Sequence, residues 1–150
     1  MVIIESEDVK QAIVERLLEV FPDVAVYKEA NTNVTYPHFF VDQMNVVDVG
    51  ERKDYHLLYY YMEIRYRNVA DPSTDLSLRN HLDEIGLKLL QNFNIINLED
   101  EKVRCTDKSY EKNEGVLQFY VTIQIMAKEL SSDEYEKQNT LDIEIELDKE

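Results

Sequence analysis

The chain has 150 residues, and 44% of them are hydrophobic, which is enough apolar material for the core of one domain. Its 31 acidic residues outnumber its 16 Lys and Arg residues, so the formal net charge at pH 7 is −15. A surface this acidic repels phosphate groups on average, which argues against a general nucleic-acid binder and against binding to anionic membranes. The single cysteine, Cys105, excludes an internal disulfide framework and a Cys-rich zinc site.

The sequence also lacks the hydrophobic segments that direct a protein into or across a membrane. No apolar run approaches the roughly 20 residues of a membrane span. Residues 1–5 do not have the pattern of a signal peptide. We therefore expect a soluble, acidic, intracellular domain.

The N-terminal segment predicts a helix over about Glu7 to Val20, because its apolar side chains recur on one helical face and Ser6 can cap it. A short strand over 24–28 and a longer one over 38–47 are expected next. Gly50 and its charged neighbours then predict a hairpin connection.

The most informative stretch is a predicted strand over Tyr55–Arg67, whose side chains alternate between two faces. The first face is apolar throughout and predicts core: Leu58, Tyr60, Met62, Ile64 and Tyr66. The second face starts aromatic and ends charged: Tyr55, Leu57, Tyr59, Tyr61, Glu63, Arg65 and Arg67. We interpret its aromatic part either as β propensity on a half-buried surface or as a contact with another protein chain.

The spacing of leucines and isoleucines predicts a second helix over about Leu78 to Asn92. Gly86 within it is either a small cost to helix stability or a point of close packing. Strands over 102–110 and 116–126 follow, joined by a loop over 111–115. This order predicts an α+β fold with a largely antiparallel (mixed) β-sheet and two main helices packed on one face.

The last twenty residues differ from the rest, so we expect a single domain over 1–130 and a distinct acidic segment over 131–150. One interpretation of this segment is a disordered acidic tail. Four aliphatic residues nevertheless alternate strictly with acidic ones: Leu141, Ile143, Ile145 and Leu147. Solvating tails rarely have this pattern, so the alternative is an arm that adds a strand to an open sheet edge of its own chain or of a neighbour.

The residue types that carry catalysis are sparse. His38, His56 and His81 do not have metal-ligand spacing, and the three glycines are isolated, so the sequence contains no phosphate loop or dinucleotide fingerprint. Neither a nucleophile elbow nor a calcium loop is present. Carboxylates are abundant, but nothing places two of them across a cleft. We therefore predict a protein that is not an enzyme, with no catalytic residues, no cofactor and no metal site.

Three segments carry a family resemblance. They are Leu-Leu-Glu-Val-Phe-Pro-Asp at 17–23 with Val-Tyr-Lys-Glu at 26–29, Pro-His-Phe-Phe-Val at 37–41, and the apolar strands around Gly115 over 110–121. Together they resemble the small tail terminator proteins of phages and prophages of Gram-positive bacteria. The resemblance spans about Val9 to Lys128.

This resemblance implies a structural protein that forms a ring, usually of about six copies, which caps the growing tail tube and joins it to the head. It implies a location in the virion tail after assembly in the bacterial cytoplasm. The implied partners are further copies of the chain, the tail tube protein and a head-side neck or connector protein, with no membrane and no sequence-specific nucleic acid. DNA would pass through the ring lumen, where fixed acids would keep it from sticking.

On this hypothesis the subunit and partner contacts come from the tyrosine-rich strand face and the C-terminal arm: Tyr55, Leu57, Tyr59, Tyr61, Leu141, Ile143, Ile145 and Leu147. Two alternatives remain open. One is a head–tail connector or neck completion protein. The other is a monomeric or dimeric α+β adaptor outside phages that binds a small partner through its acidic surface.

Overall fold

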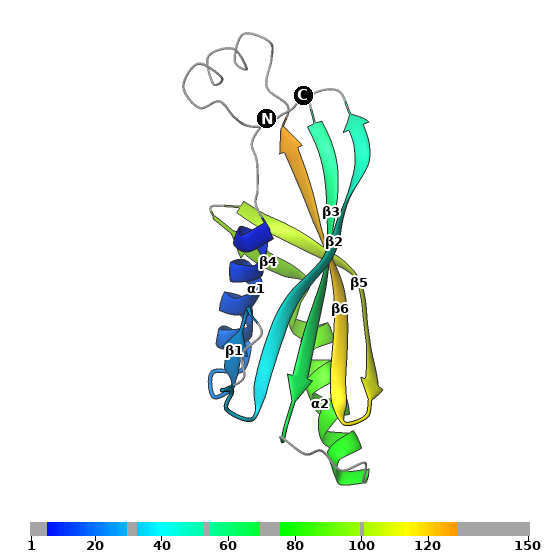
Figure 1. Ribbon diagram of the computed structural model, residues 1–150. Coiled ribbons are helices and arrows are strands. Elements are labelled where there is room, and N and C mark those ends of the chain that lie inside the picture. The colour runs from blue at the N-terminus through cyan, green and yellow to red at the C-terminus, as the bar shows by residue number, and fades with distance from the viewer. Residues whose placement is uncertain (1–5, 30–32, 53–54, 70–75, 100, 129–150) are drawn as a thin grey trace.

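The computed structural model describes residues 6–29, 33–52, 55–69, 76–99 and 101–128 (Figure 1). In chain order the elements are α1 (Ser6–Val20), β1 (Ala25–Tyr27), β2 (His38–Arg52), β3 (Tyr55–Arg67), α2 (Leu76–Asn92), β4 (Ile95–Leu98), β5 (Glu101–Asn113) and β6 (Val116–Lys128). The acidic segment 131–150 lies outside the described residues, so its alternative interpretations remain predictions.

The six strands form one sheet with the order β1-β2-β3-β6-β5-β4. The short strand β1 pairs in parallel with β2, and every other neighbouring pair is antiparallel. The predicted α+β fold with a largely antiparallel, mixed sheet is confirmed.

Both helices lie on one face of this sheet, and the sheet curls around them (Figure 1). α1 packs against β1 and β2 near one edge and against β4 at the other edge, whereas α2 packs against β5 and β6. Because α1 touches both edges, the sheet closes partly around a single hydrophobic core.

The core face of β3 is the one that the alternation predicts. Tyr60, Met62, Ile64 and Tyr66 are all at most 4% exposed, and Leu58 is partly buried against them. The Tyr66 hydroxyl also forms a hydrogen bond of 2.9 Å with Nε2 of His81 on α2, which satisfies a polar atom in the core. The alternation of side chains along the strand was therefore sufficient to predict which face belongs to the core.

Gly50 does not form the predicted hairpin connection. It lies inside β2 at a register shift opposite Leu57, with φ of +124°, a conformation that side chains rarely adopt. β2 continues to Arg52, so the strand is longer than predicted. A β-bulge uses the same conformational freedom of glycine as a turn does, which explains the error.

The second half of the chain departs from the predictions at two points. The structure contains β4, which was not predicted. β5 runs on to Asn113, so the connection to β6 is a two-residue turn, Glu114–Gly115, with positive φ at both positions (52° and 78°). Of the two alternatives for Gly86, close packing holds: the residue is buried, and a Cβ there would lie 2.8 Å from ring atoms of Tyr110.

The first helix begins one residue earlier than predicted. α1 begins at Ser6 itself, a difference within the usual spread of helix boundaries, and the side chain of Ser6 is outside the described residues, so the cap stays a prediction.

Candidate assembly surface

The distal part of the β2–β3 hairpin and the end of β6 extend past both helices (Figure 1). We call residues 44–52, 55–59 and 124–128 the distal arm; β3 pairs there with both β2 and β6, and the β2–β3 register is interrupted at Met44 and Val49. Tyr60 lies in the covered half, where burial, and to a lesser degree the carboxylate of Asp8 on α1, raises the pKa of the phenol. Leu58 and Ile125 still pack against the core, and the strand ends beyond them extend past both helices (Figure 1).

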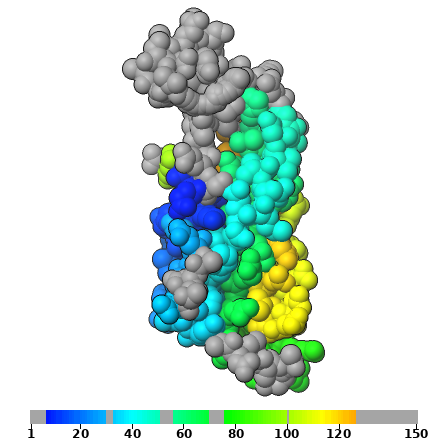
Figure 2. All heavy atoms as spheres, in the orientation of Figure 1, coloured from blue at the N-terminus to red at the C-terminus, as the bar shows by residue number. Residues whose placement is uncertain are grey.

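Apolar side chains of the distal arm are exposed on both faces of the sheet. Met44 is 55% exposed and Met126 is 61% exposed, and Val46, Val47 and Val49 are also exposed. Val46 pairs with Tyr60 and Val47 with Tyr59, so adjacent valines point to opposite faces. Figure 2 shows the later part of β2 as a continuous surface that neither helix overlies. An uncovered apolar surface of this kind is typical of an interaction site.

The predicted tyrosine face forms one side of this arm and its base. Leu57, Tyr59 and Tyr61 are half-buried on the face without helices. The rings of Tyr59 and Tyr61 form an edge-to-face pair with centroids 6.4 Å apart. Tyr55 continues the same strand, but its side chain is outside the described residues, as are Leu141, Ile143, Ile145 and Leu147. The structure thus places Tyr59 and Tyr61 together, and the contact of this face and of the C-terminal residues with another chain stays a prediction.

The edge of β2 is open over most of its length. β1 pairs only with His38–Phe40, so the stretch from Val41 to Arg52 has no strand on its outer side among the described residues. Another strand can pair with such an edge, although the N–H groups of Gln43 and Gly50 donate to the carboxylates of Asp42 and Asp48. Sequence reasoning missed this surface. The available signal was the run Met-Asn-Val-Val-Asp-Val at 44–49, which places apolar residues on both faces.

The other end of the tyrosine face of β3 carries charged residues, and it is covered by side chains of its own sheet, unlike the arm. Glu63 is only 7% exposed, and its carboxylate accepts a hydrogen bond from Nε2 of Gln118 at 3.1 Å and pairs with Nε of Arg65 at 3.2 Å. Arg65 also lies 3.5 Å from Oδ2 of Asp42 and stacks over the ring of Phe40. This polar network satisfies a buried carboxylate, so the end of the face is covered by its own side chains.

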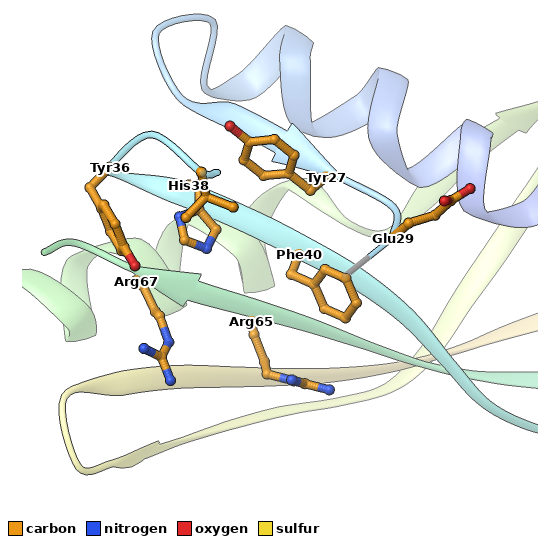
Figure 3. Close-up of a pocket in the computed structure, with 8 residues that line it drawn as sticks. Tyr27, Glu29, Tyr36, His38, Phe40, Arg65 and Arg67 are labelled. Atoms are coloured by element: carbon orange, nitrogen blue, oxygen red, sulfur yellow. The ribbon is translucent and has the colours of Figure 1, made fainter. Parts of the chain in front are cut away.

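A shallow pocket of about 250 Å³ lies beside that network (Figure 3). Its lining residues are Tyr27, Glu29, Val34, Tyr36, His38, Phe40, Arg65 and Arg67. Nδ1 of His38 lies 3.0 Å from the carbonyl oxygen of Thr35. Burial lowers the pKa of His38; the Thr35 carbonyl opposes this shift and Arg67 adds to it. The imidazole is therefore neutral at neutral pH.

The described residues offer little for catalysis. Burial raises the pKa of the Cys105 thiol to about 12, so this cysteine is a poor nucleophile. Within the described ranges no three His, Cys, Asp or Glu side chains come together as a metal site. Neither described helix combines the length and hydrophobicity needed to cross a membrane. What the structure presents instead is surface for contact with other chains.

A comparison with protein-family models identifies the class of protein. The model described as phage tail terminator protein matches residues 8–144. The chain belongs to the phage tail terminator family. The predicted resemblance is confirmed, and the match extends beyond Lys128 into the acidic segment as far as Glu144. No curated protein matches the sequence.

Membership of this family defines the general role of the chain. It is a protein of phage tail assembly and a component of the virion tail. The family is structural, which agrees with the scarcity of catalytic residues in the sequence. The adaptor outside phages is therefore the weaker of the two function classes that the sequence left open.

Proposed function

We propose that the protein forms a closed ring, of about six copies, that terminates the tail tube and joins it to the head. The observation that carries this proposal is the distal arm, which exposes apolar side chains on both faces and borders an open strand edge. A ring needs heterologous contacts, in which one surface of a subunit meets a different surface of the next. The arm supplies such a surface.

The chemistry of the arm fits a contact between protein chains. Burying Met44, Val47 and Met126 against a neighbour stabilises the complex by roughly 25 cal/mol for each Å² of apolar surface removed from water. Tyr59 and Tyr61 add large contact area with little loss of rotamer freedom. The open edge of β2 adds main-chain hydrogen bonds if the neighbour contributes a strand.

The partners of the ring are the tail tube protein on one side and a neck or connector protein on the other. A net charge of −15 suits a ring through which DNA passes, because fixed acids on the lumen wall repel phosphates. A structure of the ring with a neutral or basic lumen would contradict this part of the proposal.

Solution mass by light scattering over a concentration series, with negative-stain images of the same samples, tests the ring. We expect closed rings of about six copies for the wild type. A concentration-independent monomer that also fails to bind the ends of tail tubes would overturn the proposal.

The tyrosine face is tested by replacing Tyr59 and Tyr61 together with serine. We expect this change to weaken assembly more than it lowers the free energy of unfolding of the monomer, because both rings are only half-buried. Tyr120→Ser is the matched control, since Tyr120 is half-buried on the same face of β6 but outside the arm. Equal losses of assembly and monomer stability would mean that the two tyrosines are ordinary core.

A further inference from the structure

The pocket lies at the opposite end of β3 from the distal arm, and its lining is unusual for this chain. Arg65 and Arg67 extend side by side from β3, close to three aromatic rings contributed by Tyr27, Tyr36 and Phe40 (Figure 3). The protein as a whole is strongly acidic, with a net charge of −15. A site that combines two guanidinium groups with aromatic side chains therefore favours a ligand that has both negative charge and apolar surface.

Arg67 carries the charge that is not balanced within the pocket. Its side chain is exposed, and it forms no ion pair with a carboxylate of the described residues. Arg65, by contrast, is already paired with Asp42 and Glu63. The carboxylate of Glu29 points away from both arginines in Figure 3. Since His38 is neutral, the site offers one free cation and a second, partly neutralised one.

The walls of the pocket are apolar and partly solvent-accessible. The ring of His38 is packed between Tyr27 and Tyr36, with centroid distances of 5.5 Å and 4.9 Å. Tyr36 is exposed, and Tyr27 and Phe40 are half-buried. A ligand that fills this site needs carboxylates for the arginines and aliphatic groups for the rings.

One segment of the chain has both properties. Over 141–148 aliphatic and acidic residues alternate, so an extended conformation places acids on one face and aliphatics on the other. We propose that the pocket binds the segment Leu141–Asp148 of a neighbouring copy in the ring, with Arg67 pairing with its carboxylates. This inference rests on the ring of the proposed function. It also agrees with the extent of the family match, which includes the first part of this segment.

The distance within one chain favours a neighbour over the chain's own segment. Lys128 pairs with Tyr55 at one end of β3, and Arg67 lies at the other end of this 13-residue strand, about 40 Å away. A flexible linker of the length of 129–140 has a relaxed span of about 20 Å. Binding in the same chain would require this linker to be almost fully stretched, which lowers the effective concentration of the segment at the pocket. A segment from an adjacent copy does not have to span the distance between Lys128 and Arg67 of one chain, because its own Lys128 can lie closer to the pocket.

A phosphate backbone is the competing ligand for two arginines. It would use the guanidinium groups but not the aromatic walls, and the acidic surface around them repels a nucleic acid. The segment 141–148 is also acidic, but its four aliphatic residues gain from contact with the rings. The combination of charge and apolar contact therefore favours the protein segment.

The first experiment uses charge reversal in the full-length chain. Arg67→Glu reverses the sign of the charge at the pocket, and the double change Glu144→Lys and Glu146→Lys reverses the sign of the charge at two positions of the segment. Each variant alone should raise the concentration needed for ring assembly about tenfold, as judged by light scattering. Arg79→Glu, which changes another exposed arginine on α2 outside the pocket, is the matched control and should have no effect.

An equal mixture of the two reversed variants separates a neighbour's segment from the chain's own. In alternating rings every pocket meets a complementary segment, so the mixture should assemble as the wild type does. If the segment binds within its own chain, mixing restores nothing and the inference is wrong. It is also wrong if Arg67→Glu behaves as Arg79→Glu does.

A second measurement does not depend on the ring. A fluorescent peptide of residues 137–150 should bind the wild-type chain and the Arg79→Glu variant, but not Arg67→Glu, in fluorescence anisotropy. Absence of binding to the wild type overturns the inference even if rings form. Absence of rings with intact peptide binding would instead count against the proposed function alone. If Arg67→Glu removes binding of duplex DNA and leaves peptide binding unchanged, the pocket is a phosphate site.

Discussion

The two halves of the long strands use similar residues but have different surroundings. In the covered half, Val121 of β6 is 1% exposed beneath the helices. In the distal arm, Val46 of β2 is 40% exposed, although it pairs with Tyr60 and so points to the same face of the sheet as Val121. The difference arises because α1 and α2 overlie only part of the sheet (Figure 1). Strand formation and burial are therefore separate properties in this molecule, and the apolar surface left outside the helices is available for other chains.

The most direct test of this contrast is the same substitution in both halves. Val121→Ala should lower the free energy of unfolding by about 2–3 kcal/mol, because it removes two buried methyl groups and leaves a cavity. Val46→Ala, on the same face but beyond the helices, should lower it by less than about 1 kcal/mol but weaken ring assembly. Chemical denaturation and light scattering measure the two effects. Equal destabilisation by both changes would show that the arm belongs to the core.

Two glycines extend the comparison. Gly86 lies in α2, which covers one half of the sheet, and Gly50 lies in β2 within the distal arm. Gly86→Ala should lower the free energy of unfolding by about 1 kcal/mol, because the new Cβ meets the Tyr110 ring, whose hydroxyl donates a hydrogen bond to Asp83 at 3.0 Å. In a Tyr110→Ala background the same change should stabilise by up to about 1 kcal/mol through helix propensity.

Gly50→Ala in the arm serves as the control. A Cβ at Gly50 meets no atom within 4 Å, but its φ of +124° is strained for alanine. Its cost should therefore be the same with and without Tyr110, as measured by chemical denaturation. A cost at Gly50 that changed with Tyr110 would contradict the separation of the two halves.

A smaller effect is expected from pH at the border of the pocket. Because burial lowers the pKa of His38 in the folded state, the unfolded chain takes up this proton more readily. Stability is therefore at its full value above the ordinary histidine pKa of 6.5 and falls as the pH decreases through and below it. Denaturation curves from pH 7.5 to 5 should show a steeper loss for the wild type than for His38→Gln. Identical slopes would contradict the assignment of a neutral His38.

The smallest expected effect concerns Cys105, which is buried in the covered half. Its thiol should react with a thiol reagent such as DTNB only when the chain unfolds, because burial raises its pKa to about 12 and excludes the reagent. The labelling rate in native buffer should match that of global unfolding. Rapid labelling of the native protein would show that β5 opens independently.

Much of the fold follows from local periodicity. The bounds of β3 and its core face were predicted correctly, because alternation in Tyr55–Arg67 separates apolar from mixed residues. The second helix and its end near Asn92 follow from leucine spacing in the same way. The division of Tyr59, Tyr60 and Tyr61 between two faces was also predicted, since consecutive residues on a strand cannot all face one core; the contact of Tyr59 and Tyr61 with another chain stays a prediction.

The errors have a common cause, which is that they depend on partners far away in the chain. β4 has only four residues and is held by pairing with β5 and packing against α1, neither of which is visible in its own sequence. Gly50 has the composition of a turn, but its pairing with Leu57 places it inside a strand. The pocket was missed because Tyr27, Tyr36 and Arg67 meet only after β1 and β3 are placed on either side of β2.

The sequence by itself determined the α+β class, the two helices, the core face of β3 and the family of the protein. These depend on local spacing, on the energetics of burying apolar side chains, and on residues that remain recognisable in a linear chain. Only the tertiary structure decided which apolar residues remain outside the core and which charged and aromatic groups share a pocket. Both depend on where α1 and α2 lie on the curled sheet, because a side chain is buried by what packs over it and not by the residues beside it in sequence.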